Sequence, residues 1–239
     1  MKSKIIYLFA LFSLLFASMY GQAYTFPVRP GEEAWKTLGN TEKRYAACQL
    51  PNEILKSMTT TDLVATCLDY PLIGTLFAYN DVQTGFNAIA KGFNGIEELL
   101  TRKDAGTALM EVYAKMAPEN YDKNWSDVKK GDFSFQFSYI ETFLAQRSFQ
   151  ATLTLNEKKE LVKRCMATYT AKQKHSTIFG THGTSVTGWT MARTMENSPI
   201  VLDSTGETAL AENMFMEQGT VIDFAVVENS IKNAKNFIK

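Results

Sequence analysis

Apolar residues recur at helical spacing along most of the chain, and short polar breaks interrupt them every 8 to 13 residues or so. The clearest case is an amphipathic stretch with apolar positions at i, i+4, i+7, i+8 and i+11, which are Val82, Phe86, Ile89, Ala90 and Phe93. This spacing places all five on one face of a helix. Similar stretches predict helices at 33–48, 51–58, 59–70, 72–80, 94–100 and 104–116.

Residues that favour helix N-termini stand at several of the breaks. Thr59 is followed by Asp62, and Thr154 is followed by Glu157, which is the spacing of a capping box. Asn94 and Asp104 precede two further apolar stretches and are also expected to cap helices. The sequence therefore marks the starts of these helices as well as their buried faces.

The stretch 119–132 is polar and is the best place for a boundary between two helical halves. Beyond it, Phe133, Phe135, Phe137 and Tyr139 alternate with polar residues, which is the period of a strand. Apolar spacing that continues to Phe149 favours a largely buried helix instead, since a single strand without a partner is not stable. Helices are also expected at 154–173 and near the C-terminus, at 204–215 and 221–238.

These elements predict an all-α fold of stacked short antiparallel helices, arranged either as an irregular solenoid or as a multi-helix bundle. The expected organisation is a signal peptide at 1–23, an extended arm and first helix at 24–48, and a helical domain at 49–239. A division of that domain into two halves, at 49–118 and 133–239, is the alternative to a single unit. Lysines and arginines of the helix at 154–173, Lys172 among them, are expected on its solvated face.

The N-terminus has the features of a secretory signal peptide. Lys2 and Lys4 precede an apolar run from Ile5 to Ala17, and Gly21 and Ala23 supply the small residues that a signal peptidase reads. The run is too short to cross a bilayer as an anchor. We therefore expect cleavage near Ala23, a secreted or periplasmic protein, and no stable membrane insertion after cleavage.

Composition limits the classes of partner. The chain of 239 residues is 45% hydrophobic and 21% charged, which suits a folded globular protein. Removing the two lysines of residues 1–23 leaves 23 basic and 25 acidic residues, a net charge of −2. Such a balance gives no basic field for a polyanion, so nucleic acid is not expected as a partner.

Three cysteines are too few for a disulfide scaffold. A bridge between Cys48 and Cys67 is one reading, because helices on either side of Pro51 can lie antiparallel. The favoured reading is that the cysteines pack as small core hydrophobes, since Cys67 and Cys165 each follow a leucine by four residues on an apolar face.

The stretch 175–188 is the only one that suggests chemistry. It is small and polar, and we expect a loop that ends at a helix N-cap at Thr184 or Ser185. The alternative is a hydrolase, with His182 or His175 as base, Ser185 nearby and Asp203 to orient the base. The glycine spacing departs from a nucleophile elbow. Two histidines seven residues apart do not make a metal site, and no cofactor motif is present, so neither metal nor cofactor is expected.

Several short motifs carry a resemblance to a family. The runs Leu50–Leu55, Leu68–Pro71, Phe93–Gly95 and Lys103–Gly106, behind a signal peptide, resemble uncharacterised secreted helical proteins of Bacteroides-type bacteria. The resemblance covers most of the mature chain and implies export, but it implies no activity and no site residue.

Together these observations predict an exported, non-enzymatic helical protein that acts as a binding or scaffolding module. A protein, a peptide or a glycan is its expected partner. The alternative is the hydrolase with its site at His182.

Overall fold

The computed structural model describes residues 22–198 and 207–239, and every regular element in these ranges is helical. The prediction of an all-α fold is confirmed. The elements are α2 (Glu33–Thr37), α3 (Thr41–Ala47), α4 (Asn52–Ser57), α5 (Thr60–Leu68), η2 (Ile73–Ala78), α6 (Val82–Gly92), α7 (Asn94–Leu99), α8 (Ala105–Lys115), η3 (Pro118–Asn120), α9 (Asp127–Leu144), α10 (Arg147–Gln150), α11 (Leu155–Lys174), α12 (Ser176–Thr194), α13 (Glu207–Gln218) and α14 (Ala225–Phe237).

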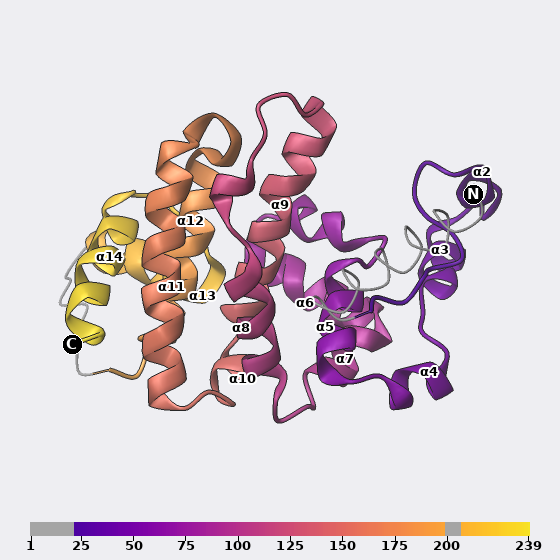
Figure 1. The fold of residues 1–239 in the computed structure, drawn as a ribbon, viewed down its shortest axis with the longest axis horizontal. Helices are drawn as coiled ribbons and strands as arrows, with labels where there is room; N and C mark the ends of the chain where they lie inside the picture. Colours follow the sequence, from indigo (N-terminus) through magenta and orange to yellow (C-terminus); the bar gives the residue numbers. More distant parts are fainter. Residues whose placement is uncertain (1–21, 199–206) are drawn as a thin grey trace, which may run out of the picture.

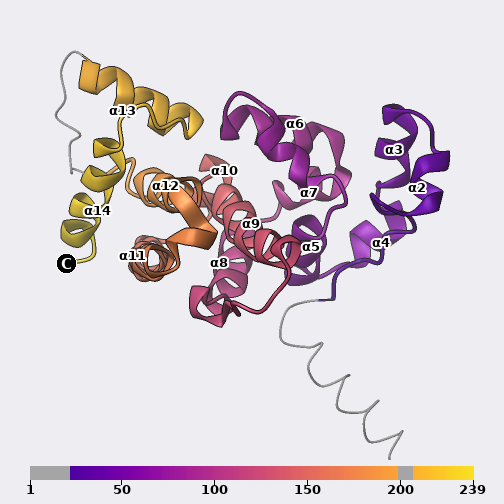
Figure 2. The same ribbon diagram turned by 90° about the horizontal axis from the view of Figure 1, so that it is seen from above.

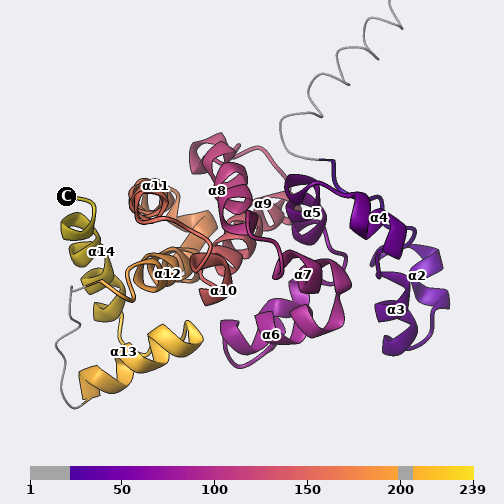
Figure 3. The ribbon, with the colours of Figure 1, turned by 90° about the horizontal axis from the view of Figure 1, so that it is seen from below.

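The helices follow one another along the long axis of the molecule (Figure 1). Helices α2 to α4 lie at one end, α13 and α14 lie at the other, and α9 lies between the two groups. Views from above and below show α11 and α12 side by side, with α9 beside α12 and with α6 and α7 on the far side of α9 (Figures 2 and 3). Helices α11 and α12 form a tight hairpin that turns at His175.

Of the caps predicted at Thr59, Asn94, Asp104 and Thr154, two form as expected. The Thr59 hydroxyl accepts a hydrogen bond from the backbone N–H of Asp62. Thr154 and Glu157 form a complete capping box at the start of α11. Asn94 instead bridges the backbone of Leu50, accepting from its N–H at 3.0 Å and donating to its carbonyl at 2.8 Å. A side-chain amide can serve as donor and acceptor at once, so this tertiary bridge replaces the cap.

The predicted cap at Asp104 does not form. Its carboxylate makes no cap hydrogen bond to the start of α8. It accepts instead from the Thr60 hydroxyl of α5 at 2.9 Å. The side chain therefore ties two neighbouring helices together.

Several helix boundaries also differ from the sequence prediction. The helix expected at 33–48 is divided into α2 and α3, because Gly39 between them adopts a left-handed φ of 77°. The loop expected over 119–132 is shorter than predicted. Ser126 caps α9, which already begins at Asp127. The phenylalanine-rich stretch that follows is helical, as predicted, but α9 ends at Leu144 and Phe149 lies in the separate helix α10.

One hydrophobic cluster includes buried residues from 49–118 and from 133–239. Contacts between α5 and α8 and between α8 and α9 continue it across the polar stretch. The Phe86 ring of α6 meets the Phe143 ring of α9 edge to face, with centroids 5.2 Å apart. Side chains from both predicted halves thus share one core.

The extended arm that precedes α2 packs onto this core. Phe26 is buried beside Tyr70 and Phe93, whose rings stack with centroids 4.2 Å apart. The Tyr24 N–H donates to the Thr66 hydroxyl at 2.9 Å. Residues 1–21 of the predicted signal peptide lie outside the described residues, so export stays a prediction. None of the helices in the described ranges combines the length and apolar character needed to span a membrane.

All three cysteines are buried and unpaired. The packing interpretation is therefore confirmed, and Cys48 and Cys67 do not form a bridge. Burial raises the pKa of each thiol, since the charged thiolate loses its hydration. Thiols in this state are poor nucleophiles.

Candidate functional site

The loop expected from 175 to a helix N-cap at Thr184 or Ser185 is helical, and this prediction was wrong, because α12 already runs through both residues. Helix α12 begins at Ser176 and is interrupted only at Gly180, where φ is 56° and ψ is −167°. Glycine reaches this conformation without the strain that a side chain would add. The break sets His182 in the first turn of the longer part of α12 and separates it from His175, whose ring contacts Tyr121 instead.

The buried face of α12 is polar because a threonine recurs every three or four residues. Thr184, Thr187, Thr190 and Thr194 each donate a hydroxyl to the carbonyl four residues earlier, at 2.7–3.2 Å. These bonds let small polar residues enter the core without an unpaired group. The same composition reads as a loop in the sequence, which explains the wrong prediction.

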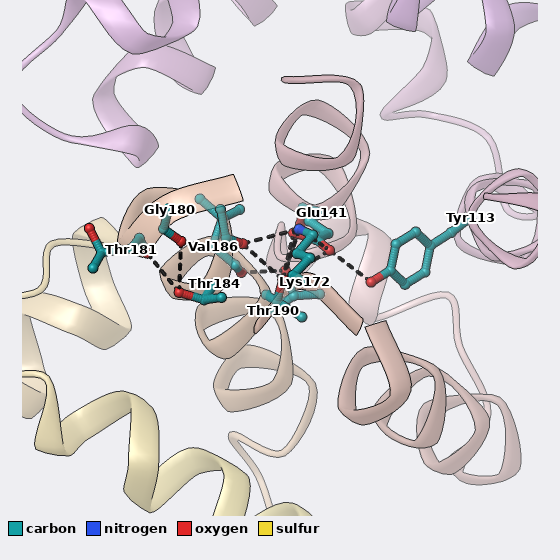
Figure 4. Close-up of polar contacts among 10 residues, drawn as sticks. Tyr113, Glu141, Lys172, Gly180, Thr181, Thr184, Val186 and Thr190 are labelled. Atoms are coloured by element: carbon teal, nitrogen blue, oxygen red, sulfur yellow. Dashed lines mark hydrogen bonds and ion pairs between the residues drawn. The ribbon is translucent and has the colours of Figure 1, made fainter. Parts of the chain in front are cut away.

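Beneath α12 lies a buried ion pair between Lys172 of α11 and Glu141 of α9 (Figure 4). Both side chains have an exposed fraction of 0%. The Lys172 ammonium lies 2.8 and 2.7 Å from the two Glu141 oxygens and 3.0 Å from both the Gly183 carbonyl and the Thr187 hydroxyl. The Tyr113 hydroxyl donates to Glu141 at 2.8 Å. Four helices therefore meet at one fully bonded polar cluster.

The sequence prediction placed Lys172 on a solvated face, and the structure contradicts it. Burial lowers the pKa of the Lys172 ammonium, although the Glu141 carboxylate opposes this shift. Burial also raises the pKa of the Tyr113 hydroxyl. The helical spacing already indicates that Lys172 lies on the buried face, because it follows Tyr169 by three residues and Cys165 by seven, and both of these face inward. Since every donor and acceptor is paired away from solvent, the cluster can position α12 but cannot reach a substrate.

A hollow of about 470 Å³ lies on the outer side of this cluster, where η2, α9 and the first turns of α12 meet. Its wall is mostly aromatic and aliphatic, with a few polar groups, and consists of Phe77, Tyr79, Asn80, Asp81, Val82, Gly131, Ser134, Phe135, Ile178, Phe179 and His182. We call it the aromatic hollow. Its volume lies within the range of roughly 300–1,000 Å³ that is typical of ligand pockets.

Ring contacts hold the aromatic hollow in shape. The His182 ring meets Phe77 edge to face at 4.8 Å and lies 6.4 Å from Phe135. Tyr139 stacks behind both, 5.7 Å from Phe77 and 6.1 Å from Phe135. Tyr79 and Phe135 nevertheless remain 43% and 42% exposed. The rings thus form a supported apolar surface that is open to solvent.

A second hollow of about 420 Å³ adjoins the first at His182. Ser185 and the loop around Val221 and Ile222 also line it. His182 and Ser185 lie on the same helix face, but no hydrogen bond joins them. The third member of the hydrolase prediction, Asp203, lies outside the described residues. The hydrolase therefore stays a prediction.

The surroundings of His182 favour its neutral form. The packing around the ring is the larger cause that lowers its pKa from the usual value, and the Lys172 ammonium adds to the shift. The ring is still partly open to solvent. A neutral imidazole offers one donor and one acceptor, so His182 can bind a polar group at the rim of either hollow.

No group of three or more histidine, cysteine, aspartate or glutamate side chains is placed to hold a metal ion within the described ranges. Comparison with known proteins found no matching family, no similar curated protein and no similar solved structure. The resemblance to secreted helical proteins of Bacteroides-type bacteria therefore stays a prediction, and the site has to be interpreted from its own geometry.

Proposed function

We propose that this protein is an exported, non-enzymatic binding module and that a peptide segment of its partner docks in the aromatic hollow. Export is taken from the signal peptide predicted at residues 1–23. The observation that carries the proposal is the pair of half-exposed rings, Tyr79 and Phe135, at a hollow whose other rings are held by the core. Exposed aromatic residues on a rigid support are typical of interface hot spots.

The position of the hollow supports binding rather than packing. The chain exposes other large apolar residues, such as Ile54, Val128 and Leu210, but none of them lines the aromatic hollow. Tyr79 and Phe135 share one concave surface instead. Single exposed apolar residues are normal on a protein surface, whereas a concave apolar cluster is typical of an interaction site.

The polar groups of the hollow favour a peptide over a glycan. A sugar carries hydroxyl groups on all its edges, and each of them needs a new partner when it loses water. The hollow offers few such groups, mainly the side chains of Asn80, Asp81 and Ser134. An apolar or mixed side chain of a peptide fits this lining with fewer unpaired groups.

The experiment is a selection of short peptides against the purified mature protein, followed by calorimetry with Phe135→Ala. Loss of the ring should weaken binding of the selected peptides about 10-fold or more, as expected for a hot-spot residue. Val128→Ala is the matched control, since Val128 lies on the same helix, is 84% exposed and does not line the hollow. Peptides that bind both variants as tightly as the wild type would show that the hollow is not the binding site.

A further inference from the structure

The formal charge in the lining of the aromatic hollow is negative. Asp81 is the only aspartate, glutamate, lysine or arginine of its lining. Asp132 follows Gly131 of the lining and is exposed. Burial raises the pKa of the Tyr139 hydroxyl, and the Asp132 carboxylate raises it further. The Tyr139 ring supports those of Phe77 and Phe135. Negative potential therefore reaches the rings of the hollow.

Two lysines near this surface are each paired with a carboxylate. Lys172 lies behind the Phe179 ring, with its ammonium 5.4 Å from the ring centroid, and it is paired with Glu141. Lys130 is paired with Asp127 at 3.2 Å. Each of these positive charges has a carboxylate partner, whereas Asp81 lines the hollow with no ion pair to a lysine or arginine among the described residues.

Aromatic faces and a carboxylate together are suited to an organic cation. The face of an aromatic ring attracts an ammonium or guanidinium group, and the attraction grows when water is excluded. Apolar walls also favour the methylene stem that carries such a charge. Phe135 and Phe77 provide the rings, and Asp81 provides the carboxylate.

The hydrogen bonds of Asp81 favour a compact ammonium over a guanidinium. One carboxylate oxygen accepts from the Thr84 N–H and the other from the Thr84 hydroxyl, both at 2.7 Å. Each oxygen therefore already has a partner, which disfavours the two parallel bonds that an arginine side chain makes with a free carboxylate. An ammonium needs only a single contact and a nearby charge.

We propose that the aromatic hollow receives a lysine side chain of the partner peptide, with its stem along the apolar wall and its ammonium between the Phe77 and Phe135 rings and the Asp81 carboxylate. This inference rests on the proposed function, because it names the group that the binding site selects. The lysine proposal states that the hollow selects the positive charge of that group, and this selection is tested separately from peptide binding.

The test uses two small probes of the same stem, n-butylammonium and 1-butanol, followed by aromatic NMR of the mature protein. Butylammonium should shift the Phe135 and His182 resonances and bind at least about five-fold more tightly than butanol, as expected for a cation–π contact with a nearby carboxylate. In Asp81→Asn the preference should fall below about two-fold. Asparagine caps a helix as well as aspartate does, so α6 should remain folded in this variant.

Equal affinity of the wild-type protein for the two probes would overturn the lysine proposal and leave the binding module intact. An unchanged preference in Asp81→Asn would also overturn it, because the carboxylate would then play no part. Probes that leave the Phe135 and His182 resonances unmoved would overturn it as well. The binding module itself fails when selected peptides are indifferent to Phe135→Ala, which the two small probes do not test, so the two failures are distinguishable.

Discussion

The buried pair of Lys172 and Glu141 allows a quantitative prediction about stability. At 2.7–2.8 Å the attraction between the charges is about 6 kcal/mol with an effective dielectric constant of ~20. Desolvation of the two ions costs several kcal/mol each and offsets most of this attraction. Lys172→Met keeps the volume but leaves the Glu141 carboxylate buried without its partner. We expect the free energy of unfolding at pH 7 to fall by about 3–5 kcal/mol.

Urea denaturation followed by circular dichroism measures this loss, which corresponds to a decrease in Tm of about 6–20 °C for a chain of this size. Lys163→Met is the matched control, since Lys163 lies on the same helix in an exposed pair with Glu160. It should change stability by less than about 0.5 kcal/mol. The double variant Lys172→Met with Glu141→Leu should recover about 2 kcal/mol or more, because no charge then remains buried.

The double variant provides an independent check of the cause, because it removes the buried charge along with its partner. A Lys172→Met variant within about 1 kcal/mol of wild type at pH 7, or a double variant no more stable than Lys172→Met, would refute the reasoning.

Three further predictions follow from the packing and charge of other residues. Gly85→Ala should destabilise the protein by at least about 3 kcal/mol, because the new Cβ would lie 1.8 Å from the Leu76 carbonyl oxygen. Gly131 also lies within a helix but has open space around it, so Gly131→Ala should stabilise the protein by about 0.5–1 kcal/mol. Equal effects of the two variants in urea denaturation would contradict the packing. NMR titration should give His182 a pKa below the usual value of about 6.5. The contribution of neutral His182 to stability is then complete above about pH 6.5 and is lost as the pH falls through the lowered pKa. A titration midpoint at or above about 6.5 would contradict this prediction. The three cysteine thiols should react with a disulfide reagent only after unfolding, and rapid labelling of the native protein would show that they are accessible.

The helices could be predicted from the sequence because their apolar faces repeat with the helical period. Helix α6 is the clearest case, as its bounds of Val82 and Gly92 nearly match the predicted stretch. The caps at Thr59 and Thr154 were also predictable, since each depends on two residues three positions apart. Asn94 and Asp104 were not, because partners distant in sequence use their side chains.

The candidate site could be predicted only in part. His182 was identified as a residue of interest, and it does line two hollows. The hollow itself depends on residues 77–82, 131–135 and 178–182, which only the tertiary fold brings together. The burial of Lys172 and of the threonines of α12 was missed, since the spacing of apolar residues does not register polar groups that find partners inside the core.

The central claim is that a peptide partner binds in the aromatic hollow, and NMR of protein labelled in its phenylalanine and histidine rings tests it most directly. On titration with a selected peptide, the resonances of Phe135 and His182 should shift and saturate together, while that of Phe237 in α14, which lines neither of the two hollows at His182, should stay in place. Saturable binding that leaves Phe135 and His182 unmoved would contradict the claim.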